Sequence, residues 1–206
     1  MNHQPFSRGQ LEVWRSGHEW CHQVEQWMDE LRATYGKPAA RLRRRETRHA
    51  KELGDEVWPL AKWLSHNADV KDWEARFCPP GGPADAHLRM PGSCRYHSLQ
   101  IVTTLDGKLF AREVHQLNSR GRTCTVVVSG KEDDDQHAQQ VVQRIESKSG
   151  KGYPPDFWLL VALEDRVRTL PELDGTLHAA QVAARKSPFD RVYLVGMLSG
   201  ETFRAR

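Results

Sequence analysis

Apolar positions in the first third of the chain recur at the spacing of an α-helix. Residues 10–66 follow this pattern at steps of three and four, which places the apolar side chains on one helical face. Gly36 and Pro38 interrupt it, and a second series predicts a helix over residues 39–64, which we expect Pro59 to kink or restart. The first apolar face comprises Val13, Trp20, Val24, Trp27, Met28 and Leu31.

A segment rich in proline and glycine divides the chain. Residues 78–92 read CPPGGPADAHLRMPG, a composition typical of loops and turns, with one short strand predicted at 86–90. Helical periodicity precedes this segment, whereas apolar, strand-like runs separated by helical patterns follow it. We therefore expect a helical N-terminal region over residues 1–77 and an α/β domain over residues 78–206.

Beyond this segment, β-branched and apolar runs alternate with helical patterns. The runs at 157–163 (FWLLVAL) and 191–198 (RVYLVGML) are continuously apolar, which is typical of parallel strands covered on both faces. A helix beginning at Thr169 separates them, so we expect these strands to be parallel neighbours. Further strands are predicted at 99–104 and 124–129, and a further helix at 133–149. The pattern predicts an α/β fold with a central mixed sheet, flanking helices and an N-terminal helical arm.

The composition of the chain indicates a cellular compartment more clearly than it indicates a function. The formal net charge of +3 over 206 residues does not by itself mark a nucleic-acid binder. The apolar run at 157–163 is far shorter than the roughly 20 residues of a membrane helix. The first ten residues, MNHQPFSRGQ, lack the apolar stretch of a secretory signal. We therefore expect a cytoplasmic protein with no membrane association, whose four cysteines are thiols.

The segment His18-Glu19-Trp20-Cys21-His22 fits the pattern HExxH. Two histidines four residues apart share a helical face and can hold Zn²⁺, while the glutamate activates the metal-bound water. A zinc metallopeptidase site at His18, Glu19 and His22 is therefore one hypothesis. Few residues precede the motif and no third ligand follows at a convincing spacing, so we expect no stoichiometric zinc and favour a helix with surface histidines.

A second group of residues surrounds the proline- and glycine-rich segment. Asp85 lies in Pro83-Ala84-Asp85, and Gln100 and Val102 alternate in the strand pattern LQIVTT. With the order of elements over about residues 48–198, this arrangement resembles the PD-(D/E)xK nuclease superfamily. That family has an aspartate near the start of one strand, and a second acid and a lysine two apart on the next. The resemblance implies a restriction-endonuclease-like fold, with Asp85 as the first acid, Gln100 at the second and Val102 at the lysine position.

The resemblance also implies a chemistry from which this sequence departs. In such nucleases the carboxylates bind Mg²⁺ and the lysine helps to activate the attacking water. Asp85 and Gln100 would hold the metal here, but Gln100 is uncharged and Val102 has no polar group. We therefore expect a degenerate site that binds nucleic acid without cutting it. Replacement groups are available at Lys108, Lys148 and Lys151, and at Glu52 and Glu56 on the preceding helix.

A run of arginines provides a candidate phosphate-binding face. Arg41, Arg44, Arg45 and Arg48 fall at three- and four-residue steps. On a helix they would share a face and form an electrostatic track, because arginine donates paired hydrogen bonds to phosphate. The alternative is a solvated helix face whose arginines pair with nearby carboxylates.

These features lead to three hypotheses about function. We favour a nucleic-acid-binding protein with a divergent metal-dependent nuclease fold, and leave open whether the nucleic acid is DNA or RNA. The first alternative is the zinc metallopeptidase. The second is a non-catalytic interaction module, in which the tryptophan-containing N-terminal helices pack against a protein partner or a second copy of the chain.

Overall fold

Seven strands form a single sheet, and their order in space follows their order in the sequence. The computed structural model describes residues 6–35, 51–104, 131–163, 170–197 and 199–206. The strands are β1 (Arg15–Ser16), β2 (Glu74–Phe77), β3 (Ala86–Arg89), β4 (His97–Thr103), β5 (Phe157–Leu163), β6 (Arg191–Gly196) and β7 (Thr202–Arg204). Strands β4, β5 and β6 are parallel to one another, and the other neighbouring pairs are antiparallel. The predicted mixed sheet is therefore confirmed.

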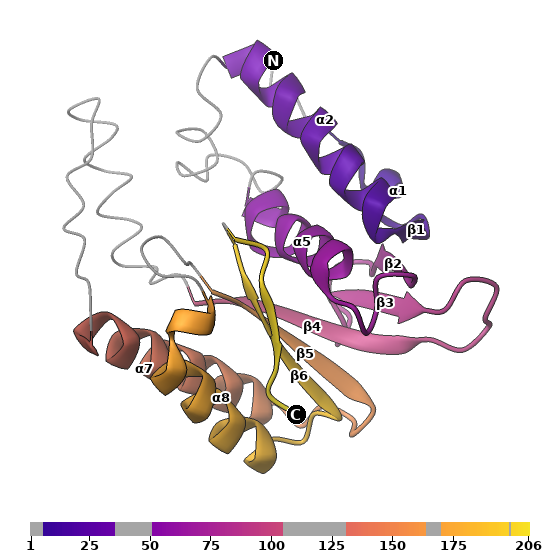
Figure 1. Ribbon diagram of the computed structural model, residues 1–206. Helices are drawn as coiled ribbons and strands as arrows, with labels where there is room; N and C mark the ends of the chain where they lie inside the picture. The colour runs from indigo at the N-terminus through magenta and orange to yellow at the C-terminus, as the bar shows by residue number, and fades with distance from the viewer. Residues whose placement is uncertain (1–5, 36–50, 105–130, 164–169, 198) are drawn as a thin grey trace.

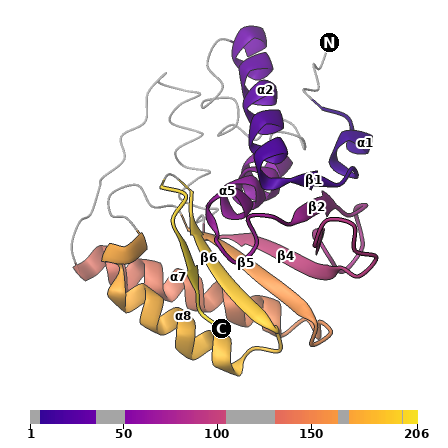
Figure 2. The same cartoon turned by 45° about the vertical axis from the view of Figure 1, so that its right-hand side comes forward.

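Helices cover both faces of this sheet (Figure 1, Figure 2). One face carries α2 (Gly17–Tyr35) and α5 (Trp58–His66), and the other carries α7 (Lys131–Ser149) and α8 (Asp174–Lys186). The π-helix η1 (Leu53–Val57) leads directly into α5, while α1 (Arg8–Leu11) and the 3-10 turn η2 (Leu170–Glu172) are short. None of the described helices is both long and apolar enough to cross a membrane.

The predicted β-α-β unit is present. β5 and β6 are parallel neighbours, and α8 lies between them in the chain. Side chains of β5 alternate between two buried clusters: Trp158 and Leu160 belong to the cluster formed with α2 and α5, whereas Leu159 and Val161 belong to the one formed with α7 and α8. Because both faces of the strand are buried, its sequence is apolar without interruption.

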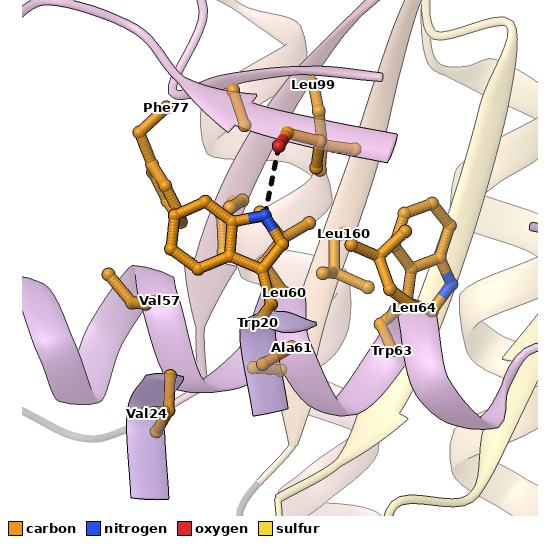
Figure 3. Close-up of a cluster of buried hydrophobic side chains, with 14 of the residues drawn as sticks. Trp20, Val24, Val57, Leu60, Ala61, Trp63, Leu64, Phe77, Leu99 and Leu160 are labelled. Carbon is orange, nitrogen blue, oxygen red and sulfur yellow. Dashed lines mark hydrogen bonds between the residues drawn. The ribbon is translucent and has the colours of Figure 1, made fainter. Parts of the chain in front are cut away.

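The N-terminal helices share a core with the sheet. Trp20 of α2 is fully buried, donates from Nε1 to the Ala75 carbonyl oxygen at 3.0 Å, and meets Phe77 edge-on with ring centroids 5.3 Å apart. Figure 3 shows this tryptophan among side chains of α5 and the sheet, including Leu60 and Leu99. One apolar cluster thus extends from α2 and α5 across β2 to β6. Residues on both sides of position 78 belong to the same sheet and the same core.

The start of the chain differs from the predicted continuous helix. Val13 is 49% exposed and does not join the apolar face, because α1 ends at Leu11 and β1 then pairs with β2. The Glu19 carboxylate accepts the Ser16 backbone N–H at 2.7 Å, and the Glu19 N–H donates to the Ser16 hydroxyl at 3.3 Å. This reciprocal arrangement is a capping box, so α2 begins afresh at Gly17.

Three short strands have no counterpart in the sequence prediction. β1 and β7 contain two and three residues, too few to show a period of two, whereas the four residues of β2 alternate between partly exposed and buried positions. Pairing with a neighbour makes them strands: β2 lies along β3 and β7 along β6. The predicted strand at 124–129, and the predicted helical residues 39–50, lie outside the described residues.

The N-terminus of α8 is capped from another helix. The backbone N–H groups of Gly175 and Thr176 donate to the Asp134 carboxylate at 2.9 and 2.8 Å. Asp134 belongs to α7, so a tertiary contact satisfies the first turn of α8. The sequence instead predicted that this helix begins at Thr169, which lies outside the described residues.

The contact between α2 and α5 requires a glycine at position 17. A Cβ atom there would lie 2.8 Å from the Leu64 Cβ and 2.9 Å from the Leu64 carbonyl carbon. We predict that Gly17→Ala lowers the free energy of unfolding by about 1–3 kcal/mol, the range of overpacked sites, as measured by urea denaturation. Gly9→Ala is the matched control, because nothing lies within 4 Å of a Cβ there. Equal stability of Gly17→Ala and the wild type would contradict this account.

Candidate functional site

A buried glutamine occupies the centre of the candidate site. Gln100, on β4, is 3% exposed. Its Oε1 accepts hydrogen bonds from Lys148 Nζ at 2.6 Å and from the Tyr153 hydroxyl at 3.0 Å, and its Nε2 donates to the Pro83 carbonyl oxygen. Because an amide oxygen has two lone pairs, both of its acceptor positions are in use. Donors on one side and an acceptor on the other hold the amide in one orientation.

Asp85 lies beside Gln100 because β3 is shorter than β4. β3 has four residues and β4 has seven, so β4 continues past the start of β3. The Asp85 Oδ2 accepts the Ile101 N–H at 2.7 Å, while the Asp85 N–H donates to the Leu99 carbonyl oxygen at 2.9 Å. The carboxylate thus takes the place of a backbone carbonyl for a buried strand. The structure therefore brings together Asp85 and Gln100, the two residues that the sequence selected.

A lysine reaches this pair from helix α7 rather than from β4. Val102, at the position of the superfamily's lysine, packs partly buried in the apolar cluster with α7 and α8. Of the three replacement lysines that the sequence suggested, Lys148 contacts Gln100 directly. Lys151 is exposed and acts on Asp85 through its charge, and Lys108 lies outside the described residues.

Asp85 and Lys148 stabilise each other's charged forms. Burial raises the pKa of Asp85, while the Ile101 N–H, the Lys148 ammonium and a hydrogen bond with Gln100 act to lower it. Burial lowers the pKa of Lys148, and the Asp85 carboxylate acts to raise it. For both groups burial outweighs the opposite charge nearby, so the pKa of Asp85 is raised and that of Lys148 is lowered.

Glu56 enters the site from a π-helical turn. Pro59 has no N–H and cannot continue the α-helical ladder, and just before it the Trp58 N–H bonds to the Leu53 carbonyl oxygen, five residues back. This wider spacing defines a π-turn, a feature frequent at functional sites. Glu56 lies within the turn and lines the same cavity as Asp85.

The pKa of Glu56 is raised to about 7, first by burial and then by the nearby charge of Asp85. Arg8 and Lys148 act to lower it, but do not cancel these effects. Two carboxylates that share a site resist joint ionisation, and a bound cation would relieve this. Within the described parts of the chain no group of three or more His, Cys, Asp and Glu side chains is arranged to hold a metal ion. Asp85 and Glu56 would therefore need water or amide oxygens to complete a Mg²⁺ shell.

A polar cavity of about 250 Å³ adjoins the two carboxylates. Its lining also includes Lys51, Glu52 and Arg8. Arg8 forms an ion pair with Glu52 and donates to the Cys78 carbonyl oxygen, which ties α1 to the helix of Glu52 and to the end of β2. The cavity can accept a small charged group, because both signs of charge line it.

The HExxH residues have other roles in the structure. His18, Glu19 and His22 are exposed on α2. The Glu19 carboxylate accepts the Ser16 N–H and hydroxyl at 2.7 and 2.8 Å, and these bonds lower its pKa. The His22 Nε2 lies 3.0 Å from the Gln26 side-chain nitrogen. Glu19 thus caps its helix, and the described residues bring no third protein ligand to the two histidines.

Parts of the site escaped the sequence prediction, and one prediction lies outside the described residues. Arg41, Arg44, Arg45 and Arg48 belong to the undescribed segment 36–50. Tyr153 and Arg8 were not foreseen, because neither stands in a recognisable motif. Their only signal is position: Tyr153 follows α7 and precedes β5, close to where β4 presents Gln100.

Comparison with known proteins adds no relative to this picture. No family model, curated protein or solved structure shows a significant match to the chain. The roles of the site residues therefore follow from geometry and charge. What the geometry offers is a buried amide, two carboxylates and a lysine around one small cavity.

We predict that Glu56→Gln stabilises the fold in a pH-dependent way. A carboxyl group with a raised pKa binds its proton more tightly in the folded state, so its contribution to stability falls as the pH rises from 4.5 to about 7. The variant should be more stable than the wild type above pH 7, by up to about 3 kcal/mol for a pKa raised from 4.5 to about 7. The difference should vanish near pH 4.5.

Urea denaturation at pH 5 and pH 8 measures this effect. Glu146→Gln, at an exposed position of α7, is the control and should change stability little at either pH. A stability difference for Glu56→Gln that is the same at both pH values would show that Glu56 is ionised throughout.

Proposed function

We propose that this chain binds nucleic acid through a restriction-endonuclease-like fold and leaves the strand uncut. The observation that carries the proposal is the state of Gln100. This side chain stands where the PD-(D/E)xK superfamily has its second acid, and its carbonyl oxygen accepts from both Lys148 and Tyr153. It therefore offers a metal ion neither a negative charge nor a free oxygen.

The order of elements supports the likeness to that superfamily. A helix precedes the three antiparallel strands β2, β3 and β4, and α7 then leads to β5, which is parallel to β4. Asp85 immediately precedes β3, and Gln100 lies on β4. Two successive strands thus carry the first acid and the position of the second, as in the PD-(D/E)xK pattern.

The two carboxylates of the site are candidate magnesium ligands. Asp85 and Glu56 would hold Mg²⁺, because both line one cavity and carboxylate oxygens are the ligands that this ion prefers. When bound, the ion would neutralise phosphate charge and lower the pKa of a water ligand. Lys148 is hydrogen-bonded to Gln100 and is not free to position that water. We therefore expect the site to bind nucleic acid without hydrolysing it.

Basic side chains near the cavity supply the attraction for phosphate. Lys51 lines the cavity, and Lys151 is exposed and close enough to Asp85 to act on its pKa. The run of Arg41, Arg44, Arg45 and Arg48 ends three residues before Lys51 in the sequence. Contacts of this kind give affinity for any nucleic acid and carry no sequence information.

Metal-dependent cleavage is the second candidate function, and Glu56 is the observation that favours it. Burial raises its pKa and the charge of Asp85 raises it further, and both carboxylates line one cavity in which they could share a cation. In this arrangement Glu56 replaces the acid missing at Gln100, and Lys148 replaces the lysine missing at Val102. The two functions differ in whether a bound strand is hydrolysed.

We predict that the wild-type protein binds labelled DNA or RNA in the presence of Mg²⁺ or Mn²⁺ and leaves it intact on a gel. Gln100→Glu adds a third carboxylate of the same shape, so Mg²⁺ should then raise the temperature of thermal unfolding by mass action. In the wild type this rise should be smaller. Cleavage by the wild type that disappears in Asp85→Ala, while binding persists, would establish the second candidate function instead.

We also predict that binding weakens steeply with salt, because each neutralised phosphate releases counterions. Replacing Arg44, Arg45 and Arg48 with Ala should reduce the slope of log affinity against log salt by about 3 and weaken all sequences about equally. Titrations by fluorescence anisotropy at several salt concentrations measure this. Replacing Arg185 and Lys186, two exposed cations at the end of α8, is the control. If the arginine substitutions leave the salt slope unchanged, these arginines form a solvated helix face and do not bind phosphate.

A further inference from the structure

A second cavity lies at the turn between β3 and β4. Its volume is about 550 Å³, against about 250 Å³ at the candidate site. Pockets for small organic ligands measure roughly 300–1,000 Å³. The second cavity therefore has room for a nucleobase, whereas the first suits a phosphate group or an ion.

Aromatic rings line this second cavity. Trp73 and His97 stack with ring centroids 5.5 Å apart, and His97 stacks in turn on the buried Trp158 at 4.5 Å. Tyr96, also in the lining, is 51% exposed. Proteins hold unpaired bases of any sequence by stacking on such rings. Asp156, in the same lining, adds an acceptor for the amino groups of a base.

Arginines gather beside the aromatic cavity. Arg76 and Arg89 both lie over the ring of Trp14, with guanidinium carbons 4.8 and 4.1 Å from its centroid. Arg89 also lines the cavity and pairs with Glu74 at 2.8 Å, whereas Arg76 has no carboxylate partner among the described residues. Stacking on Trp14 positions the guanidinium groups while their N–H edges remain able to bind phosphate.

One face of the sheet connects this cavity with the candidate site. Arg76, His87 and Ser98 lie opposite one another on β2, β3 and β4, and all three are partly exposed. Ser98 is two residues from Gln100 and so lies on the same face of β4. His97 is three residues from Gln100 and so points to the opposite face. The cavity meets this face at Arg89 and at Tyr96, whose ring centroid lies 4.3 Å from that of His87.

We propose that this face binds single-stranded nucleic acid, with an unpaired base in the cavity beside Tyr96 and phosphates on Arg76 and Arg89. A duplex cannot bind in this way, because its bases are stacked and paired and enter a cavity only when flipped out. The inference rests on the proposed nucleic-acid binding and names its substrate class. In this proposal the base site is distinct from the candidate site, where the phosphate backbone of the nucleic acid binds.

Fluorescence anisotropy tests the substrate class with three probes: a labelled single strand of DNA, the same sequence as RNA, and the DNA duplex. We expect at least one single strand to bind at least tenfold more tightly than the duplex. The stronger of the two single strands then identifies the sugar. A single strand that contains 2-aminopurine reports the base contact, because stacking on an aromatic ring quenches its fluorescence.

Variants at exposed positions separate stacking from charge. Tyr96→Ala should weaken single-strand binding about tenfold and remove most of the quenching, while Tyr96→Phe keeps the ring and should retain both. Arg76→Gln should reduce the salt slope by about one. Arg185→Gln, at an exposed position of α8, is the matched control and should leave all three readouts unchanged. Thermal unfolding of each variant checks that the fold is intact.

The outcomes distinguish this inference from the function on which it rests. Equal affinity for single strand and duplex, or affinity and quenching that survive both Tyr96→Ala and Arg76→Gln, would overturn the inference and leave nucleic-acid binding standing. No binding to any of the three probes would overturn both.

Discussion

The hydrogen bond from the Ile101 N–H to the Asp85 carboxylate is the interaction on which the site depends. β4 runs past the start of β3, and a buried N–H at that point needs an acceptor. Asp85 provides it, which places its carboxylate at the edge of the sheet. Because β3 begins only after Asp85, groups from both faces reach this point: Glu56 precedes α5 on one face, and Lys148 ends α7 on the other.

The charges around Asp85 explain how the site is stable without an ion. Lys148 acts to lower the pKa of Asp85, and Glu56 has a pKa of about 7 because Arg8 and Lys148 do not offset burial and the charge of Asp85. A carboxylate in place of Gln100 would add a third negative charge, which a buried site tolerates poorly unless a metal is bound. The amide removes that repulsion and is satisfied by Lys148 and Tyr153. Because the hydrogen-bonding groups of Gln100 already have partners, the site gains less free energy from binding a cation.

Local pattern was enough to predict much of the architecture. The continuous apolar runs at 157–163 and 191–198 indicated parallel strands covered on both faces, and β5 and β6 have this arrangement. The period of three and four residues indicated α7 and most of α2. The resemblance to the PD-(D/E)xK pattern, rather than periodicity, suggested Asp85 and Gln100 as a pair. The inferences from periodicity use interactions within one element or between elements that are close in the sequence.

Sequence by itself therefore determined the α/β class and the parallel pair, since apolar periodicity is a local property, while the resemblance to the PD-(D/E)xK pattern suggested Asp85 and Gln100 as a pair. Only the tertiary structure decided which charged groups surround them. Lys148 lies 48 residues from Gln100 in the chain, and Glu56 reaches Asp85 through a π-turn that no periodicity signals. The short strands β1, β2 and β7 likewise form because they pair with neighbouring strands. Burial and charge at a site depend on packing between distant segments, which no local pattern contains.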